Sequence, residues 1–304
     1  MNPDVTLTAA ELRALETQRF AVPVSDAVFH LTGSGVAECL QGVLTNDVIK
    51  PGAHALVWGA LLTPKGMIVS DAWVRRRDGE AWLVVPASAR ETIQQLFTRS
   101  FPPRLAKVHD VTDAVAVRWL IGGAPESLAV ADLVRPHGKA PFTALLLTTD
   151  AARDDARLSD AGWHSAPAEW ADALKLLEGW PTLGREIDDK TLPQEVRFDE
   201  LEGVRYDKGC YTGQETVARV HFRGHANRTL RGLRWIGDAG PSDATVSTPE
   251  KVVGSVRTLG RMGSEWLALS VLRRELSPGD QVIAGGAPAV VVELPFDIAE
   301  DALA

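Results

Sequence analysis

The sequence is poor in metal-binding side chains, and this scarcity excludes several kinds of protein. Only two cysteines, Cys39 and Cys210, occur in 304 residues, which fits neither a disulfide framework nor a cysteine-only metal site. An iron–sulfur cluster held by one chain usually needs about four cysteines. Among the histidines only His221 and His225 have a metal-like spacing, and residues 222–224 between them predict a loop. We therefore expect no resident metal.

Basic excess and long apolar runs are also missing. The chain has 32 Lys and Arg against 40 Asp and Glu, a net charge of −8, which argues against a general nucleic-acid-binding protein but allows local basic patches. No apolar run approaches the ~18 residues of a membrane span, and residues 1–10 lack a charged-then-apolar signal pattern. We expect a cytoplasmic protein that binds neither a membrane nor nucleic acid directly.

What is present suffices for a large core. Hydrophobic residues make up 45% of the chain, and its length suggests about two domains. Helical and strand-like segments interleave without a regular βαβ rhythm, which favours an α+β fold over a doubly wound sheet. After Arg228, short apolar runs alternate with Gly, Pro and Asp turns and predict a small antiparallel barrel. We therefore divide the chain into domains 1–228 and 229–304.

Local signals predict several elements before that boundary. Two capping boxes, which begin at Thr8 and Ser88, each predict the start of a helix. The Pro-Lys-Gly triplet at 64–66 predicts a hairpin between two strand-like runs. Residues 182–206 carry many charges and few regular signals, and a connection of about 25 residues is usually functional.

The segment around Cys210 concentrates the most chemistry. Lys208, two residues earlier, is a cation that favours a thiolate. Thr212 and Glu215 have the spacing of a capping box, which predicts a short helix whose N-terminus also favours an anion. The alternative is that Cys210 is a buried small hydrophobe, and the residues alone leave both interpretations open. For Cys39 we expect the packing role.

Four segments carry a resemblance to a known family. The run Lys-Gly-Cys-Tyr-Thr-Gly-Gln-Glu at 208–215, continued at 217–219 and 221–224, resembles the signature of the YgfZ family, folate-binding relatives of the glycine-cleavage T-protein (aminomethyltransferase). Three earlier segments resemble signatures of the T-protein superfamily: residues 40–42 with 45–47, residues 62–66 with Asp71, and residues 192–195. The resemblance covers nearly the whole chain. It implies a cloverleaf of two α+β lobes and a C-terminal antiparallel β-barrel around a central channel, where relatives bind tetrahydrofolate.

The resemblance also implies a function. Family members assist iron–sulfur cluster assembly or repair and so affect tRNA modification indirectly, with iron–sulfur enzymes or assembly proteins as transient partners. T-proteins have a related Lys-Gly-x-Phe segment without Cys210, which favours the YgfZ branch. The alternative is a tetrahydrofolate-dependent aminomethyltransferase or methyltransferase that depends on Asp71, so whether the chain is an enzyme stays open. A third interpretation is a binding module whose folate pocket has decayed.

A bound pterin sets requirements for its site. Its N–H groups suit a carboxylate, its faces suit aromatic walls, and its glutamate tail suits a cation. We predict catalytic roles for Cys210, Lys208 and Asp71, the last in an otherwise apolar strand where an unpaired charge is costly. The predicted contacts of tetrahydrofolate or a one-carbon derivative are Asp71, Glu195, Tyr211, Gln214, Glu215, Arg219 and Arg223. Solvated loop charges and surface salt bridges are the ordinary alternatives for Glu195 and the two arginines, and Trp180 is a further candidate wall.

The chain departs from its relatives near residues 175–197. Relatives often carry an Arg and a Glu before the Gly-x-Pro that matches residues 179–181, whereas this chain has Lys175 and Leu177. Val196 and Arg197 stand where relatives often have an Asn. These changes leave open whether the chain keeps the folate contacts that relatives make from this region.

Overall fold

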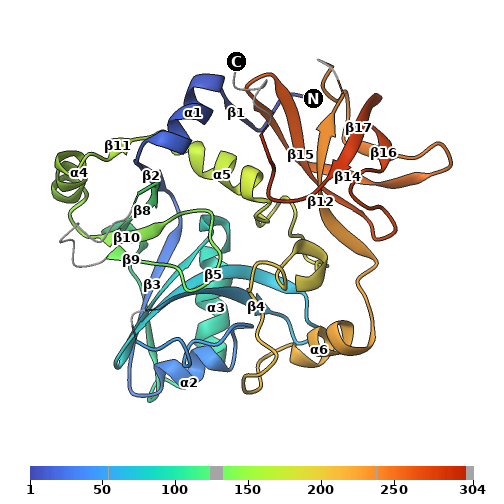
Figure 1. Cartoon of the computed structure of the whole chain (residues 1–304). Coiled ribbons are helices and arrows are strands. Elements are labelled where there is room, and N and C mark those ends of the chain that lie inside the picture. Colours follow the sequence, from blue (N-terminus) through green and yellow to red (C-terminus); the bar gives the residue numbers. More distant parts are fainter. Residues whose placement is uncertain (54, 124–132, 237–238, 299–304) are drawn as a thin grey trace.

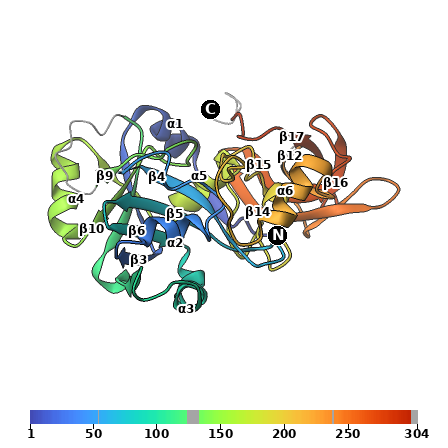
Figure 2. The same ribbon diagram turned by 90° about the horizontal axis from the view of Figure 1, so that it is seen from below.

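The chain folds into two five-stranded sheets and a barrel. The computed structural model describes residues 1–53, 55–123, 133–236 and 239–298. Figures 1 and 2 show the two sheets on one side of the molecule and the barrel on the other. This arrangement confirms the predicted α+β fold of two lobes and a C-terminal antiparallel barrel. No helix among the described residues is long and apolar enough to cross a membrane.

The first lobe is built on a sheet of strand order β4-β5-β6-β3-β7. Its strands are β3 (Ala27–Thr32), β4 (Leu56–Leu62), β5 (Ile68–Arg77), β6 (Glu80–Val85) and β7 (Lys107–Asp110), and its helices are α2 (Val36–Gln41) and α3 (Arg90–Ser100). Phe29, Leu83 and Phe97 join strands and helix in one buried cluster. The hairpin predicted at residues 64–66 is confirmed, since β4 and β5 pair around it.

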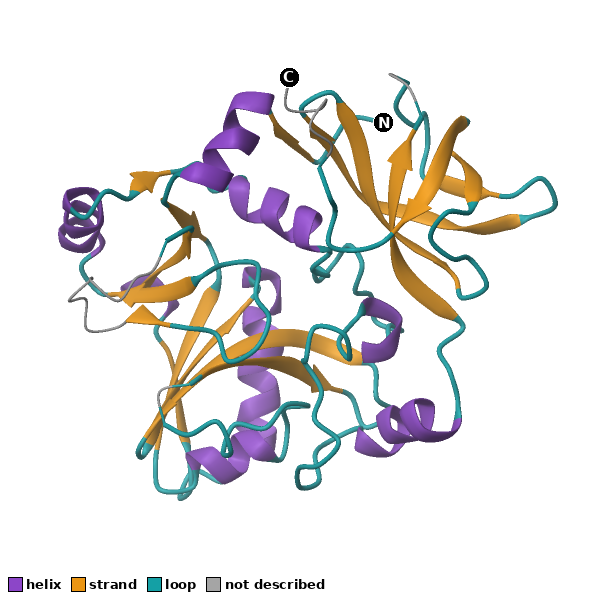
Figure 3. Ribbon diagram, viewed as in Figure 1, coloured by secondary structure: helices purple, strands orange, loops and turns teal. Residues whose placement is uncertain are grey.

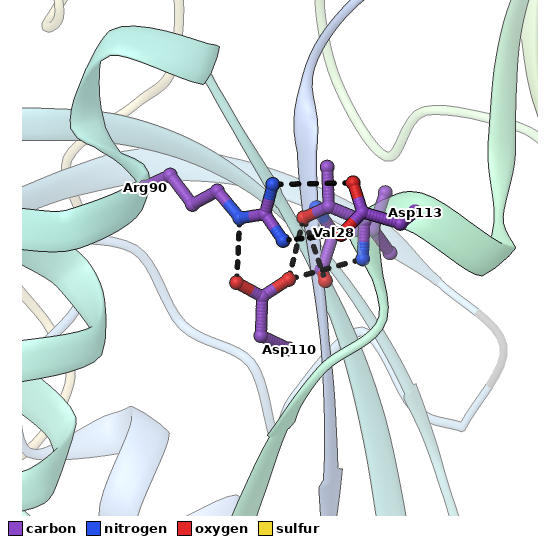
Figure 4. Close-up of polar contacts among 5 residues, drawn as sticks. Val28, Arg90, Asp110 and Asp113 are labelled. Atoms are coloured by element: carbon purple, nitrogen blue, oxygen red, sulfur yellow. Dashed lines mark hydrogen bonds and ion pairs between the residues drawn. The ribbon is translucent and has the colours of Figure 1, made fainter.

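Arg90 fastens α3 to the edge of this sheet (Figure 4). Its Nε donates to Asp110 Oδ2 (2.6 Å) and its Nη2 to Asp113 Oδ2 (3.0 Å). Beside it, the Val28 N–H donates to Thr112 Oγ1 (3.0 Å). Burial alone would raise the pKa of Asp110, but the hydrogen bonds from Arg90 and Thr112 outweigh it and lower that pKa. The turn after β7, which includes the 3₁₀ helix η2 (Thr112–Ala114), is thereby held on β3.

The second lobe has the strand order β11-β2-β8-β10-β9. Its strands are β2 (Phe20–Val24), β8 (Ala116–Ile121), β9 (Leu133–Val134), β10 (Ala144–Thr148) and β11 (His164–Ser165), and its helices are α1 (Ala9–Thr17), α4 (Ala151–Asp160) and α5 (Trp170–Glu178). Strands β2 and β3 follow one another in the chain but lie in different sheets. The two-residue connection Ser25-Asp26 therefore links the lobes.

The regular elements of the barrel are strands, joined by loops, as Figure 3 shows. Its strands are β12 (Arg228–Trp235), β13 (Thr245–Ser247), β14 (Val252–Met262), β15 (Glu265–Arg273), β16 (Gln281–Ala284) and β17 (Ala287–Val292). They close into a six-stranded antiparallel ring through the β14–β15 pairing. The N-terminal strand β1 (Val5–Leu7) adds to β14 in parallel, which ties the start of the chain to its end.

Helix starts follow the sequence signals only in part. The capping box at Thr8 is present, with Glu11 N–H donating to Thr8 Oγ1 (3.3 Å) and Thr8 N–H donating to Glu11 Oε2 (2.7 Å). The prediction that Ser88 caps α3 is wrong. A 3₁₀ turn, η1 (Ala87–Ala89), occupies that position. Helix α3 therefore begins at Arg90, without a side-chain cap.

Candidate functional site

The four signature segments meet around the loop that carries Cys210. Figure 1 shows the linked ends of β4 and β5 directed toward α6 (Gln214–Arg223), the helix that follows this loop. Residues 40–47 lie at the end of α2, and residues 192–195 enter the 3₁₀ helix η4 (Pro193–Val196). The following contacts connect each segment with the loop or with α6.

Lys208 anchors the loop to the end of α2. Its Nζ donates to the carbonyl oxygens of Gln41 (2.8 Å), Leu44 (2.6 Å) and Asn46 (2.9 Å). These three bonds use all three protons of the ammonium. Burial lowers the pKa of Lys208 to about 8, against the opposing charge of Asp47. Among described residues, no hydrogen bond joins Lys208 to Cys210. The hydrogen bonds of the amine instead position the loop.

Cys210 lies between two anchored neighbours and is itself exposed. On one side is Lys208. On the other, the buried Tyr211 ring lies 5.1 Å from Lys208 Nζ, and the Thr212 N–H donates to Gly42 O (3.0 Å). The alternative that Cys210 is a buried hydrophobe is therefore wrong. Its thiol can meet a molecule that arrives from solvent.

The helix after Cys210 begins differently from the prediction. The Thr212–Glu215 capping box is absent, because Gly213 is the N-cap residue in a left-handed conformation (φ 82°) and no side chain caps α6. The prediction of a loop at residues 222–224 is also wrong, since α6 continues through Arg223. The long stretch from Gln214 to Arg223 is thus a rigid element next to the thiol.

Gly213 allows α6 to touch the β4–β5 hairpin. A Cβ at Gly213 would lie 2.6 Å from Thr63 O and 3.0 Å from Gly66 Cα. A Cβ at Gly66 would in turn lie 2.9 Å from Thr216 Cβ. The two glycines therefore permit a backbone approach that no other residue would allow. This contact explains why Gly recurs in two of the signatures.

A chain of hydrogen bonds links this loop with Asp71. Trp58 Nε1–H donates to Asp71 Oδ2 (3.1 Å), and Asn46 Nδ2 donates to Trp58 O (2.7 Å). Asn46 O in turn accepts from Lys208 Nζ. Asn46 Nδ2 also donates to Glu202 O (2.7 Å), just before the loop. The buried carboxylate and the exposed thiol are thus parts of one connected framework.

Asp71 is buried among aromatic rings with one oxygen free. Asp71 Oδ1 is buried and lacks a hydrogen-bond partner, and so does Trp119 Nε1. Burial raises the pKa of Asp71, against the Trp58 hydrogen bond and the charge of Lys175. Trp180, the predicted wall, lies in the same cluster, 4.4 Å from the Trp58 ring centre. An acceptor and a donor without partners therefore adjoin flat apolar surfaces.

A second carboxylate that the sequence analysis missed is close enough to Asp71 and Lys175 to be affected by their charges. Burial raises the pKa of Asp26 to about 6, with Lys175 lowering it and the charge of Asp71 raising it further. Asp26 occupies the two-residue connection between the lobes. The sequence does contain a signal that could have identified Asp26, because it is an acidic residue in a two-residue connection between two apolar strands.

Glu195 has a structural partner. Its carboxylate accepts from Arg228 Nε and Nη2, both at 3.0 Å, and from the Leu192 N–H (3.1 Å). Arg228 opens the barrel, so this pair joins η4 to β12. Next to it, Gln194 Nε2 donates to Val217 O of α6 (3.1 Å). The side chains of the third signature segment, residues 192–195, therefore hold α6 and the first barrel strand in place and are not directed at Asp71.

The remaining predicted folate contacts lie on α6. Glu215, Arg219 and Arg223 are exposed, and Gln214 is half-buried. The positions 215, 219 and 223 share the solvent face of the helix, because they are four residues apart. The structure does not bring the two arginines into the aromatic cluster of Asp71.

The departures from the relatives have structural roles of their own. Arg197 Nη1 donates to Glu178 O (3.0 Å) and Gly179 O (2.8 Å), and its Nη2 donates to Leu294 O (3.1 Å). Arg197 therefore fastens the end of α5 to the segment after the barrel. Lys175 extends over the Trp119 ring at 5.4 Å. Among the described residues, no group of three or more His, Cys, Asp or Glu side chains is arranged to hold a metal ion.

Comparisons with known proteins agree with this architecture. Residues 6–145 match the family model of the GCVT N-terminal domain. The chain adopts the fold of the glycine cleavage system aminomethyltransferase T from Bartonella henselae, with a TM-score of 0.75 over 91% of this chain and 86% of that chain, at 18% identity.

Curated relatives extend the match along the sequence. The "tRNA-modifying protein YgfZ" of Vibrio vulnificus (strain YJ016) is 29% identical, covering 76% of this chain and 74% of the relative. Those of Enterobacter sp. (strain 638) and Cronobacter sakazakii are each 30% identical; the first match covers 67% of this chain and 68% of the relative, and the second 71% and 70%. Fold, signature contacts and sequence similarity together place this chain in the YgfZ family.

Proposed function

We propose that this chain is a cytoplasmic folate-binding protein that assists iron–sulfur cluster assembly or repair, and so supports tRNA modification, with Cys210 as its reactive group. The observation that carries the proposal is that three other signature segments contact the loop that carries the exposed thiol or the helix that follows it. Lys208, Tyr211 and Thr212 are fastened on either side of the thiol, while the sulfur itself faces solvent. Relatives named as tRNA-modifying proteins support the biological setting.

The unpaired polar atoms of the aromatic cluster support a reduced pterin as the ligand. Asp71 Oδ1 offers an acceptor and Trp119 Nε1 a donor, both buried and without partners, and a pterin edge presents both kinds of group. Burying such atoms unpaired is costly, so a polar ligand that pairs them gains affinity. Trp58, Trp73 and Trp180 form the apolar surroundings of this carboxylate and pack against one another. When bound, tetrahydrofolate supplies a carrier for one-carbon units.

The protein's own residues would then have distinct tasks. Asp71 would hold the ring's N–H groups, with Trp58 fixing the orientation of its carboxylate. Cys210 would act outside the aromatic cluster, on a partner in solution. One thiolate can fill only one of the four positions that usually hold a cluster, so contact with a cluster would be transient.

Complementation of a deletion strain tests the role of the thiol. We expect Cys210→Ser to fold as the wild type, because the side chain is exposed, and to lose rescue of iron–sulfur enzyme activity and of tRNA modified-nucleoside content. Cys39→Ser, at the half-buried second cysteine, is the matched control and should rescue. Full rescue by Cys210→Ser would refute the proposal.

An aminomethyltransferase or methyltransferase is the second candidate, favoured by the buried carboxylate of Asp71 with its free oxygen. Tetrahydrofolate-dependent transfer by the pure protein, abolished in Asp71→Asn and retained in Cys210→Ala, would select it. Calorimetric titration of tetrahydrofolate into the wild type and both variants separates these cases. Absence of binding to the wild type would instead select a module that works through protein contacts alone.

A further inference from the structure

The outer face of α6 is an unpartnered surface next to the reactive loop. Glu215, Ala218, Arg219, Phe222 and Arg223 line a hollow of about 400 Å³. Their spacing of three and four residues puts them on one stripe of the helix. Phe222 is 68% exposed, the highest value among the exposed large hydrophobic residues that the structure describes. The opposite face of α6 buries Val217 and receives Gln194.

A second hollow lies at the start of the barrel, close to α6 along the chain. It has a volume of about 520 Å³ and is lined at its rim by Arg228, Val252, Arg273, Arg274 and Glu275. Val252 is 60% exposed. Asn227 lies in this hollow, four residues after Arg223, so the two hollows are at most about 14 Å apart along the chain. Figure 1 shows α6 below the barrel, with a connecting segment that leads from the end of the helix to β12.

Both hollows combine an exposed apolar side chain with unpaired arginines. Within the described parts of the chain, the side chains of Arg219, Arg223 and Arg274 make no hydrogen bond or ion pair. These cations gather on one surface of a chain whose net charge is −8. Large aromatic residues and arginine are also enriched where proteins bind one another.

Charge distinguishes a protein from nucleic acid as the occupant. Each hollow includes a glutamate, Glu215 in one and Glu275 in the other; Glu275 is already paired with Lys251 (3.0 Å). A continuous row of phosphates would meet Glu215 with repulsion, whereas a protein segment can place a cation opposite it. The exposed rings and methyl groups of Phe222 and Val252 likewise need apolar side chains to cover them.

We propose that the face formed by α6 and the adjoining barrel rim docks a protein client through a segment whose apolar side chains are flanked by carboxylates. This inference rests on the proposed function, because it supplies the surface on which Cys210 meets its partner. Cys210 lies four residues before α6, at most about 14 Å along the chain from the start of the helix. A client that lies along α6 from Phe222 toward Gln214 would therefore extend toward the thiol.

Photocrosslinking in the deletion strain tests the inference. The full chain carries benzoylphenylalanine in place of Phe222, and the adduct is treated separately with RNase and with protease. We expect a protein adduct whose crosslinked peptide is acidic. The double variant Arg219→Glu/Arg223→Glu should lower its yield and the rescue of tRNA modification about tenfold, the effect of 1.4 kcal/mol. Arg99→Glu/Arg104→Glu, two exposed arginines of the first lobe, is the matched control and should leave both unchanged.

The outcomes separate the docking surface from the function of the thiol. An RNase-sensitive adduct, no adduct, or a yield that charge reversal leaves unchanged would overturn the docking proposal. Cys210→Ser should retain the adduct while it loses rescue. If Cys210→Ser instead rescues fully, the proposed function fails, whatever the crosslinks show.

Discussion

At the scale of single residues, the structure gives Lys208 a task that the sequence did not suggest. We predicted that it favours a thiolate at Cys210, and no finding tests that role. Its amine is instead committed to three carbonyl oxygens at the end of α2. A sequence reveals that a lysine is near a cysteine in the chain, but not which way its long side chain turns. The buried partners of Lys208 come from residues more than 150 positions away.

Lys208 should make stability depend on pH. Its folded pKa, about 8, lies below the ordinary value of 10.5, so between these values the unfolded chain binds more protons and stability rises with pH. We expect the free energy of unfolding of the wild type, relative to Lys208→Met, to rise by about 1–2 kcal/mol from pH 7.5 to pH 9.5. Urea denaturation of both proteins at the two pH values measures this. A constant difference would contradict the lowered pKa.

Asp71 should show the opposite dependence. Burial raises its pKa, so the native state binds more protons than the unfolded chain between the ordinary value of about 4 and the raised value. The free energy of unfolding therefore falls as pH rises through this range. We expect Asp71→Asn to be more stable than the wild type at pH 7, by about 1 kcal/mol, while it binds tetrahydrofolate more weakly. Urea denaturation and calorimetric titration check the two effects. A less stable Asp71→Asn would mean that the contacts of the carboxylate outweigh the cost of its burial.

At the scale of elements, most segments could be predicted and their ends could not. The β4–β5 hairpin and the start of α1 were predicted correctly, because turn residues and capping boxes act on their immediate neighbours in the chain. The start of α6 depends instead on a hairpin about 150 residues earlier, which packs against Gly213. Short strands such as β1, which pairs with β14, are too brief for a pattern and form only because a distant partner is present.

Gly213 provides a test of the contact between α6 and the hairpin. Gly213→Ala would combine a left-handed backbone (φ 82°) with a Cβ 2.6 Å from Thr63 O. Gly79→Ala is a matched control, since Gly79 has φ 74° and nothing within 4 Å of its Cβ position. We expect a loss of about 3 kcal/mol for Gly213→Ala and about 1 kcal/mol for Gly79→Ala. Equal losses in thermal or urea unfolding would show that the hairpin contact adds nothing.

At the scale of the whole molecule, the lobes and the barrel are joined by buried ionic side chains. Arg197 reaches from the connection after α5 to Leu294 O beyond the barrel, and Glu195 reaches Arg228 at the first barrel strand. The motif that includes Glu195 was visible in the sequence. Its role as a joint was not, because the partner is 33 residues away, at the first residue of barrel strand β12. The predicted boundary at Arg228 thus coincides with a contact that holds the parts together.

The Glu195–Arg228 pair should stabilise the contact between η4 and the barrel. The main reason is that removal of one partner leaves the charge of the other buried and unpaired. Arg228→Met would leave the 7% exposed Glu195 unpaired, and we expect a loss of about 2 kcal/mol, discounted because the Arg228 side chain is 39% exposed. Glu195→Gln/Arg228→Met removes both charges and should recover much of this loss. Urea unfolding of the wild type, both single variants and the double variant measures the coupling. If the double variant loses as much as the sum of the singles, the two side chains act independently, and the barrel is held to the lobes by the shared apolar core and by Arg197 instead.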